Sequence, residues 1–479
     1  MDLNSLTFLL FAIGVVVLSN CFPSAAGRGT VLAFASAVFI GSYASTPLQL
    51  VPLLSFQTLC FGVVRAVQWR PSRRMVWAGV TAVLLCFIYL KRFSFIDSLP
   101  ALPFAYVMVG LSYILFRIVH LTVDIGQGTL QERIGPMAFF NYTCNFLSFV
   151  SGPIQRYQDF VEASNRPLKL DDKVVSAAFS RIVGGFIKVA VISGIADHIF
   201  NQLAPRLTEQ NGGMPMPAMA LLFATAAMIY VVYLYYNFSG YMDIVIGIGR
   251  LIGIDLPENF NKPFSSRNFL EFWSRWHITL SDWFKTYVFN PIMKCMVNHI
   301  PSVAMLPVLG VIAFFVTFML MGMWHGTGSV FLIYGLMMGA GASTNKLWQI
   351  AMPRLLGKQR YKALCGGATY SWLCSGMTCA WFALGLACFW LELPQFTFLA
   401  QSLGVQGIIF AFCVLTMVSG IILGLTNYAS SRLAPLASRI AVSVRGVVVH
   451  NLMLGTRVVI IGLVLSFFHK APEFVYRAF

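Results

Sequence analysis

The sequence predicts an all-α integral membrane protein, a polytopic bundle of roughly 11 to 14 membrane-embedded helices, some of them re-entrant or interfacial. The chain is 58% hydrophobic and only 10% charged, whereas soluble domains carry about 25% charged residues. Apolar runs recur along all 479 residues, and in lipid only a helix or a closed barrel satisfies its own backbone hydrogen bonds. No polar stretch between the runs is long enough for a soluble domain.

The apolar runs give the expected order of the helices. They centre near residues 12, 36, 55, 82, 107, 144, 188, 225, 245, 312, 335, 380, 415 and 460. The first run has Asp2 as its only flanking charge and no basic start, which is typical of a retained span rather than a signal peptide. Without an internal repeat or a low-complexity linker, residues 1–479 are expected to form a single polytopic domain.

The net charge of +16 does not indicate nucleic-acid binding, because the cations lie between apolar runs and form no basic domain. Loops rich in Lys and Arg are typical of the cytoplasmic side of a membrane. Three such stretches are therefore expected to be cytoplasmic: Arg65 to Arg74, Lys346 to Lys362 and Arg432 to Arg445. The last two flank the runs near 380 and 415, and this pair of crossings returns both stretches to one side.

Several classes of chemistry are disfavoured. The ten cysteines are scattered without a C-x-x-C pair, so neither a disulfide framework nor a zinc site is expected. Phosphate-binding loops, dinucleotide fingerprints, G-x-S-x-G elbows and H-E-x-x-H motifs are missing from the sequence, which argues against nucleotide hydrolysis and zinc hydrolysis. We expect no bound metal and no bound cofactor.

Residues 255–294 differ from the rest of the chain because charges alternate there with Phe and Trp. This mixture is too polar to span a membrane and too aromatic for a free loop, so it predicts an interfacial or re-entrant pair of amphipathic helices. Ser265 or Ser266 is a candidate cap for the second helix, and Pro257, Pro263 and Pro291 punctuate the stretch.

His325 is the most unusual of the seven histidines, because it lies among glycines between two apolar runs, in Met-Gly-Met-Trp-His-Gly-Thr-Gly at residues 321–328. Glycines allow a substrate or a neighbouring helix to approach closely, and ionisable groups at membrane depth mark functional sites. A hydrogen-bonded core histidine in a helix-breaking turn explains the position equally well. His277 lies among tryptophans at residues 273–281 and can be either a packed interfacial histidine or a catalytic one.

Asp243 is the last residue of a polar interruption at residues 235–243, just before another apolar run. A carboxylate is costly in lipid unless it faces water or a cation. Arg250 lies at a suitable helical spacing to pair with Asp243, and this structural pairing competes with a functional role.

Five motifs in order resemble the membrane-bound O-acyltransferase (MBOAT) family, in particular its bacterial branch with the D-alanyl transferase DltB and the alginate O-acetyltransferase AlgI. They are Ser-Gly-Pro-Ile-Gln-Arg-Tyr at 151–157, Phe-Ser-Gly-Tyr at 238–241, Pro-Glu-Asn-Phe-Asn-Lys-Pro-Phe at 257–264, Phe-Trp-Ser-Arg-Trp-His at 272–277 and Trp-His-Gly at 324–326. Each is weak alone, but their joint order is specific. The resemblance implies a catalytic core at about residues 111–340 and additional membrane helices at 395–479.

The resemblance implies that His325 and His277 are the family's two conserved histidines and line a central tunnel through the protein. His325 is the candidate general base. His277, Asn259 or Asn261 is expected to position the donor or to stabilise the oxyanion. The other expected substrate or tunnel positions are Trp324, Trp276, Arg275, Ser281 and Asp243. Lys262, Arg267 and Lys285 are either docking residues for an acidic carrier protein or a phosphorylated cofactor, or plain membrane anchors.

The expected function is that of a membrane-bound O-acyltransferase in the bacterial cytoplasmic membrane. The acyl group, with acetyl favoured over D-alanyl, would pass from a cytoplasmic thioester donor, acyl-CoA or acyl carrier protein, to a hydroxyl of an envelope polysaccharide or teichoic-type polymer. An extracytoplasmic or membrane partner protein is expected to complete delivery. Asn237 and the absence of Gly-Gly-Asn after Tyr287 depart from AlgI, which leaves the acyl group and the acceptor open. The alternative is a transporter or flippase without transferase chemistry, for which we see no repeat symmetry.

Overall fold

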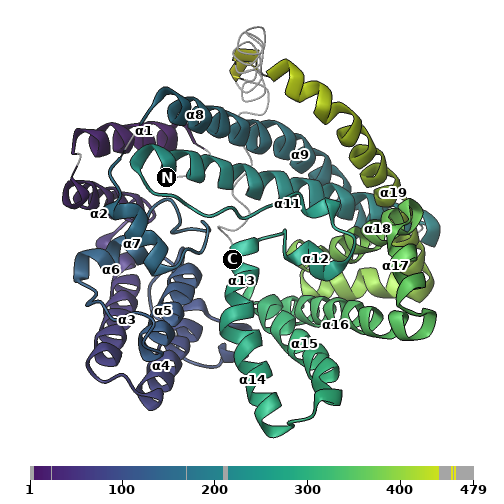
Figure 1. Ribbon diagram of the computed structural model, residues 1–479, viewed down its shortest axis with the longest axis horizontal. Helices are drawn as coiled ribbons and strands as arrows, with labels where there is room; N and C mark the ends of the chain where they lie inside the picture. The colour runs from purple at the N-terminus through teal and green to yellow at the C-terminus, as the bar shows by residue number, and fades with distance from the viewer. Residues whose placement is uncertain are drawn as a thin grey trace. The chain divides into compact units, whose positions relative to one another are not determined.

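The computed structural model describes residues 5–22, 24–168, 170–208, 214–441, 455–456 and 458–459. Within these ranges the regular structure is helical, apart from one isolated antiparallel bridge between Phe260 and Trp276 (Figure 1). The all-α prediction is confirmed.

Seven helical stretches are long and apolar enough to cross a membrane. They are Pro47–Trp69, Arg73–Lys91, Asp172–Thr208, Met216–Ile252, Val303–Trp324, Ala368–Phe389 and Leu393–Ser430, and Thr7–Cys21 and Ala25–Gly41 are shorter apolar helices. The chain is therefore a multi-pass membrane protein.

The number of long helices is lower than the number of apolar runs for local reasons. The runs near 225 and 245 belong to one helix, Met216–Ile252, so the polar residues between them do not interrupt it. The run near 107 precedes a helix that begins at Leu111, and the run near 144 adjoins a helix of eight residues, Pro136–Thr143. Most of the run near 460 lies outside the described residues.

The described residues divide into two compact units, and the first comprises those of Met1–Ala190 and Asn237–Glu258. Its helices are α1 (Leu6–Cys21), α2 (Ala25–Gly41), η1 (Pro47–Leu50), α3 (Val51–Trp69), α4 (Arg73–Lys91), η2 (Ser94–Ile96), α5 (Leu111–Gly126), α6 (Pro136–Thr143), α7 (Tyr157–Asn165) and α8 (Asp172–Phe186). Ser5, Ser24, Ser72 and Asp171 cap α1, α2, α4 and α8 by accepting a backbone N–H three residues on. These caps explain why the helices begin where they do.

Arg117 on α5 holds the interior of the first unit together. Its guanidinium is buried and donates to the carbonyl oxygens of Thr143 at 2.7 Å and Ser148 at 2.8 Å. The Tyr241 hydroxyl donates to the neighbouring carbonyl of Leu147 at 3.1 Å. Together these bonds satisfy the buried backbone of the non-helical stretch that leads into residues 151–157, the first of the five motifs.

The second unit comprises Val191–Tyr236 and the described residues of Asn259–Phe468. The π-helix η3 (Ile187–Ser193) and α11 (Met216–Ile252) contribute to both units. The other helices are α9 (Gly194–Leu203), α10 (Pro205–Thr208), η4 (Pro263–Ser265), α12 (Phe269–Trp273), α13 (Ile278–Phe284), η5 (Lys285–Phe289), α14 (Asn290–His299), η6 (Val303–Met305), α15 (Leu306–Trp324), α16 (Val330–Leu356), α17 (Lys358–Gly366), α18 (Ala368–Gly385), η7 (Leu386–Phe389) and α19 (Leu393–Ala441).

Two pairs of helices in this unit pack through glycines, α15 against α16 and α18 against α19 (Figure 1). A Cβ atom on Gly322 would lie 2.2 Å from the Cα of Gly335, and one on Gly376 would lie 2.2 Å from the carbonyl oxygen of Thr416. Small residues that let helix backbones approach are the usual means of packing inside a membrane.

Residues 255–294 form short helices, as the sequence predicts, but the predicted cap is wrong. Asn268 caps α12, because its side-chain oxygen accepts the Glu271 backbone N–H at 2.9 Å. Ser265 and Ser266 instead donate to the carbonyl oxygens of Lys262 and Pro263 and close the turn before α12.

The assignment of the whole chain to one domain, with a core at residues 111–340, stays a prediction. Of the additional segment at 395–479, α19 covers the part up to Ala441, with a kink at Gly404, where φ is +58°. Apart from residues 455–456 and 458–459, the remainder lies outside the described residues.

Candidate functional site

His325 lies at the junction between α15 and α16 and is 3% exposed. Three aromatic rings surround its imidazole, with centroid distances of 4.9 Å to Trp324, 5.5 Å to Tyr334 and 5.3 Å to Phe389. The rings come from the end of α15, from α16 and from η7. An imidazole in such surroundings favours its neutral form, because burial disfavours charge.

The glycine after His325 fixes the turn that carries it. A Cβ atom on Gly326 would lie 2.0 Å from the ring of Phe331, far inside contact distance. Together with the close approach of Gly322 and Gly335, this packing holds the end of α15 tightly against the start of α16. The glycines seen in the sequence serve this helix packing.

His277 is completely buried and has a left-handed backbone, with φ +47° and ψ +53°. Such a conformation costs about 1–3 kcal/mol for a residue other than glycine and persists only where its surroundings enforce it. The bridge between Phe260 and Trp276 enforces it here, with backbone bonds from Asn261 N–H to the Arg275 carbonyl and from Ile278 N–H to the Asn259 carbonyl, both at 3.0 Å. His277 thus sits at a strained turn before α13.

Asn259 connects the bridge to the imidazole of His277. Its side-chain Oδ1 accepts the backbone N–H of Thr279 at 3.1 Å and the hydroxyl of Thr279 at 2.9 Å. The same oxygen lies 3.3 Å from Nδ1 of His277. A backbone N–H can only donate, so the Thr279 N–H identifies this atom of Asn259 as the acceptor. Nδ1 of His277 must then carry the hydrogen, which leaves Nε2 as the acceptor nitrogen in the neutral ring.

The two histidines belong to the same unit. Burial lowers the pKa of His277 well below its usual value, and the nearby His325 lowers that pKa further. His277 is therefore neutral at physiological pH. The His277 ring therefore lies beside Asn259 and within electrostatic range of His325.

The predicted tunnel residue Trp276 packs as part of an aromatic cluster. Its ring is 2% exposed and stacks on Phe272 at 5.5 Å, with Phe260 and Phe382 at 5.1 and 4.9 Å. Because Trp276 directly precedes His277, its packing in this cluster supports the strained turn.

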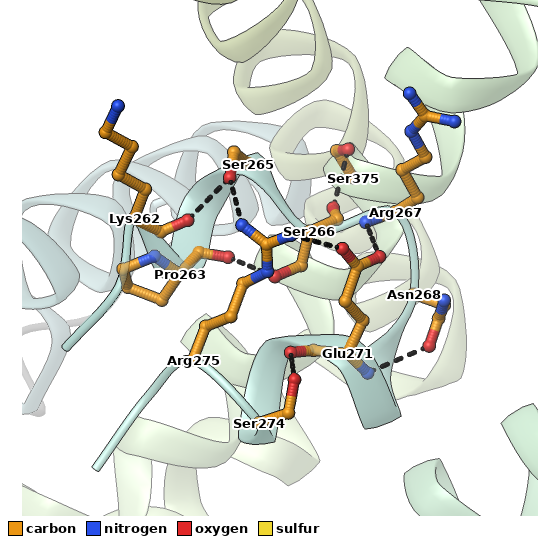
Figure 2. Close-up of polar contacts among 10 residues, drawn as sticks. All are labelled: Lys262, Pro263, Ser265, Ser266, Arg267, Asn268, Glu271, Ser274, Arg275 and Ser375. Atoms are coloured by element: carbon orange, nitrogen blue, oxygen red, sulfur yellow. Dashed lines mark hydrogen bonds and ion pairs between the residues drawn. The ribbon is translucent and has the colours of Figure 1, made fainter. Parts of the chain in front are cut away.

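Arg275, Ser281 and Asn261 also contact the framework of the turn. Figure 2 shows the guanidinium of Arg275 between the Ser265 hydroxyl, at 3.1 Å, and the Glu271 carboxylate, at 2.8 Å. Ser281 donates to the Trp276 carbonyl at 3.3 Å. The side chain of Asn261 is exposed, in contrast to that of Asn259. The tunnel roles of these residues and of Trp324 stay predictions.

The three predicted docking cations, Lys262, Arg267 and Lys285, are exposed. In Figure 2 the side chains of Lys262 and Arg267 extend away from the polar cluster around Glu271. The backbone N–H of Arg267 donates to the Glu271 carboxylate at 2.9 Å, which fixes the start of its side chain. Among the described residues, none of these three cations forms an ion pair.

Asp243 lies in the first unit and pairs with two cations. Its carboxylate lies 3.0 Å from Nε of Arg181 and 2.6 Å from Nζ of Lys188. The predicted pairing of Asp243 with Arg250 is wrong, because the Arg250 guanidinium instead lies 3.9 Å from the Glu258 carboxylate. Sequence spacing along one helix favoured Arg250, whereas the actual partners come from the neighbouring α8 and η3.

No group of three or more His, Cys, Asp or Glu that could hold a metal ion occurs in the described part of the chain. The expectation of no bound metal and no bound cofactor stays a prediction.

The family model of the membrane-bound O-acyltransferases matches residues 127–389, more than half of the chain. This match includes both histidines and every predicted site residue. The chain belongs to the membrane-bound O-acyltransferase family. The resemblance seen in the five motifs is thereby confirmed.

Two kinds of curated bacterial protein are similar to this MBOAT chain. It is 31% identical over 230 residues to a teichoic acid D-alanyltransferase of Bacillus subtilis, covering 48% of this chain and 56% of the relative. It is 29% identical over 310 residues to a probable alginate O-acetylase, AlgI, of Pseudomonas putida, covering 61% of this chain and 57% of the relative. The chain thus spans little more than half the length of these relatives.

The structure adds residues to the site that sequence reasoning missed. Tyr334 and Phe389 contact His325 but lie in apolar runs that carry no distinguishing signal. Thr279 lies two residues after His277, and this proximity in the sequence is a signal that could have identified its hydroxyl as a site group. Its partnership with Asn259 depends on the bridge between Phe260 and Trp276, 16 residues apart, which spacing alone does not reveal.

Proposed function

We propose that this protein transfers an activated acyl group from a cytoplasmic thioester donor to a hydroxyl group outside the bacterial cytoplasmic membrane. Membership of the MBOAT family supports acyl transfer. The observation that carries the assignment to these residues is the pair of buried imidazoles of His277 and His325 within one unit.

In the proposed reaction His325 is the general base. Its neutral imidazole takes the proton of the acceptor hydroxyl while the hydroxyl oxygen forms a bond to the thioester carbonyl carbon. The carbon–sulfur bond then breaks, and the imidazolium returns the proton to the departing thiolate. A positioned base of this kind contributes about 10²–10⁴-fold to the rate.

His277 is proposed to orient the donor or to stabilise the developing oxyanion, with Asn259 holding its ring. Donation of Nδ1–H to Asn259 leaves Nε2 as an acceptor. An acceptor nitrogen can take a proton, or it can orient the acyl donor by accepting a hydrogen bond from one of its N–H or O–H groups. Stabilising an oxyanion would require the protonated ring. Burial of His277 opposes that form, so the first role is favoured.

Lys262, Arg267 and Lys285 are proposed to dock the donor, acyl-CoA or acyl carrier protein, by charge complementarity. Their exposure and the absence of ion pairs to them among the described residues support this role. A central tunnel past Trp324, Trp276 and Asp243 is proposed as the route between the two compartments, with residues 111–340 as the catalytic core.

The acceptor is proposed to be an envelope polysaccharide or a teichoic-type polymer, reached directly or through a partner protein. The relatives named as alginate O-acetylases align over more of this chain than the D-alanyltransferase of Bacillus subtilis, which favours acetyl as the transferred group. D-alanyl transfer is the second candidate, because its relative has the higher identity. Transport without chemistry is the alternative class.

Mass spectrometry of envelope polymers from cells with and without the gene tests the function. We expect an acyl ester on one polymer that disappears with the gene and returns with the unaltered gene. A His325→Ala protein should insert into the membrane at a normal level and leave the polymer unacylated. Normal acyl content in cells with the variant would refute the assignment, and unchanged polymers after gene loss would favour the transporter.

A further inference from the structure

A cavity of about 600 Å³ lies within the second unit, between α12, α16, α17, α18 and α19. The histidines are not among the residues that line it. Because α18 and α19 are candidate membrane spans, the cavity walls extend into the part of the protein that lipid surrounds.

Most of the exposed wall of this cavity is apolar, with aromatic rings along it, while Arg267, Asn268 and Glu271 contribute polar groups. Trp381 donates its indole N–H to the Met337 carbonyl at 3.0 Å, and Trp348 donates to the Tyr370 hydroxyl at 3.0 Å. With these polar atoms satisfied, the ring faces remain as apolar surface, to which Phe412 adds a third ring. Such walls suit a hydrocarbon chain.

The depth of the cavity matches one leaflet of a bilayer. Its lining residues on α18 run from Tyr370 to Trp381, which is about 16 Å at 1.5 Å per residue. The hydrocarbon core of a bilayer is about 30 Å thick, so one leaflet occupies about 15 Å. A single acyl chain of a membrane lipid would therefore fit along α18.

The end of the cavity at α17 is strongly basic. Tyr361 and Cys365, one helical turn apart, line the cavity, while Lys358, Arg360 and Lys362 on the same short helix are exposed. Arg267 lines the cavity as well, and its guanidinium extends away from the cluster that holds its backbone (Figure 2).

Glu271 is the acidic residue that lines the cavity, and its carboxylate pairs with Arg275 at 2.8 Å rather than with the cations of α17. The sequence contains no Asp or Glu between Asp282 and Glu392. Among the described residues, the cations of α17 form no ion pair. Basic pockets between membrane helices on the cytoplasmic side are suited to anionic lipid head groups, and the α17 stretch carries the charge excess of a cytoplasmic segment.

We propose that this cavity binds an anionic phospholipid of the cytoplasmic leaflet, with one acyl chain along α18 and the phosphate head group at the cations of α17. The cavity shares Arg267 with the proposed donor-docking residues but does not include the histidines, and its test measures lipid binding alone. A soluble phosphorylated ligand shares the head-group chemistry but would leave the apolar depth of the cavity without an occupant.

Two native thiols report on the occupant, because Cys365 and Cys374 line the cavity while Cys295 is exposed elsewhere. The full-length protein is reconstituted in phosphatidylcholine vesicles with or without phosphatidylglycerol and treated with a membrane-permeant maleimide, and labelling is mapped by peptide mass spectrometry. We expect phosphatidylglycerol to slow labelling of Cys365 and Cys374 at least tenfold and to leave Cys295 unchanged. Equal labelling in both vesicles, or protection by inorganic phosphate alone, would overturn the proposal.

Two variants test the binding of the lipid head group and of the acyl chain separately. Lys358→Gln, Arg360→Gln and Lys362→Gln together should weaken phosphatidylglycerol retention, measured by native mass spectrometry, by about tenfold or more. Met377→Trp should fill the apolar wall and release the lipid with the cations intact. The matched control, Arg73→Gln with Arg74→Gln, removes exposed charge at the start of α4 and should retain the lipid. Unchanged retention in both cavity variants, or equal loss in the control, would refute the site.

Discussion

Asn259 offers a graded test of how the second histidine is held. Asn259→Leu removes one acceptor that serves the Thr279 backbone N–H, the Thr279 hydroxyl and Nδ1 of His277. Leaving the buried N–H unsatisfied should cost about 1–3 kcal/mol of stability. The bond to Nδ1 is worth about 1 kcal/mol, so its loss should lower turnover about fivefold through the tautomer alone. Any loss of turnover beyond fivefold would measure how far the strained turn of His277 relaxes.

Asn259→Asp separates geometry from charge, because a carboxylate keeps an acceptor in the same place. It should preserve stability but raise the pKa of His277, since a negative charge favours the imidazolium. The His277 ring would then stay protonated up to a higher pH, so the acidic limb of the pH–rate profile should move to higher pH.

The assay is turnover against pH in nanodiscs, with the donor and polymer identified by mass spectrometry, together with ¹⁵N chemical shifts of His277. Asn427→Leu, an exposed asparagine on α19, is the matched control. Unchanged turnover and tautomer in Asn259→Leu, or a pH profile in Asn259→Asp identical to that of the native protein, would refute the reasoning.

Three further predictions follow from the packing and the charges. Gly326→Ala should destabilise the protein by about 1–3 kcal/mol and lower activity, because the added Cβ overlaps Phe331; a thermal shift equal to that of the native protein would contradict this. Charge reversal at Lys262 and Arg267 should raise the donor KM more than it lowers kcat, and an unchanged KM would remove the docking role. Hydrogen bonding from Arg181 lowers the pKa of Glu258 below 4.5, so this pair stabilises the fold above that pH and loses its contribution as pH falls through the lowered pKa. Arg181→Gln should therefore flatten the acidic side of the stability profile, measured by unfolding at a series of pH values.

Much of the architecture could be predicted because a membrane restricts it. Apolar runs of sufficient length can only be helices there, and the structure confirms helices at most of the predicted centres. The runs near 225 and 245 were not recognisable as one helix, because Asn237 and Asp243 look like an interruption in sequence. In the structure Arg181 and Lys188 neutralise the cost of Asp243, so the helix continues.

The site was predictable as a set of residues but not as a geometry. His325 stood out because glycines flank it, and those glycines do pack helices closely. The left-handed backbone of His277 had no sequence signal, since left-handed positions usually carry glycine or asparagine. Asn259 and Asn261 were equivalent in sequence, and only the bridge to Trp276 buries one and exposes the other.

Acyl transfer by the His325 imidazole is tested most directly by the acyl content of the envelope polymer in cells that carry His325→Gln in place of the native gene. Glutamine keeps a polar side chain of similar length in the aromatic pocket but cannot act as a base. We predict normal membrane levels of the variant and at least a hundredfold slower acylation. Acylation at the native rate would contradict the central claim.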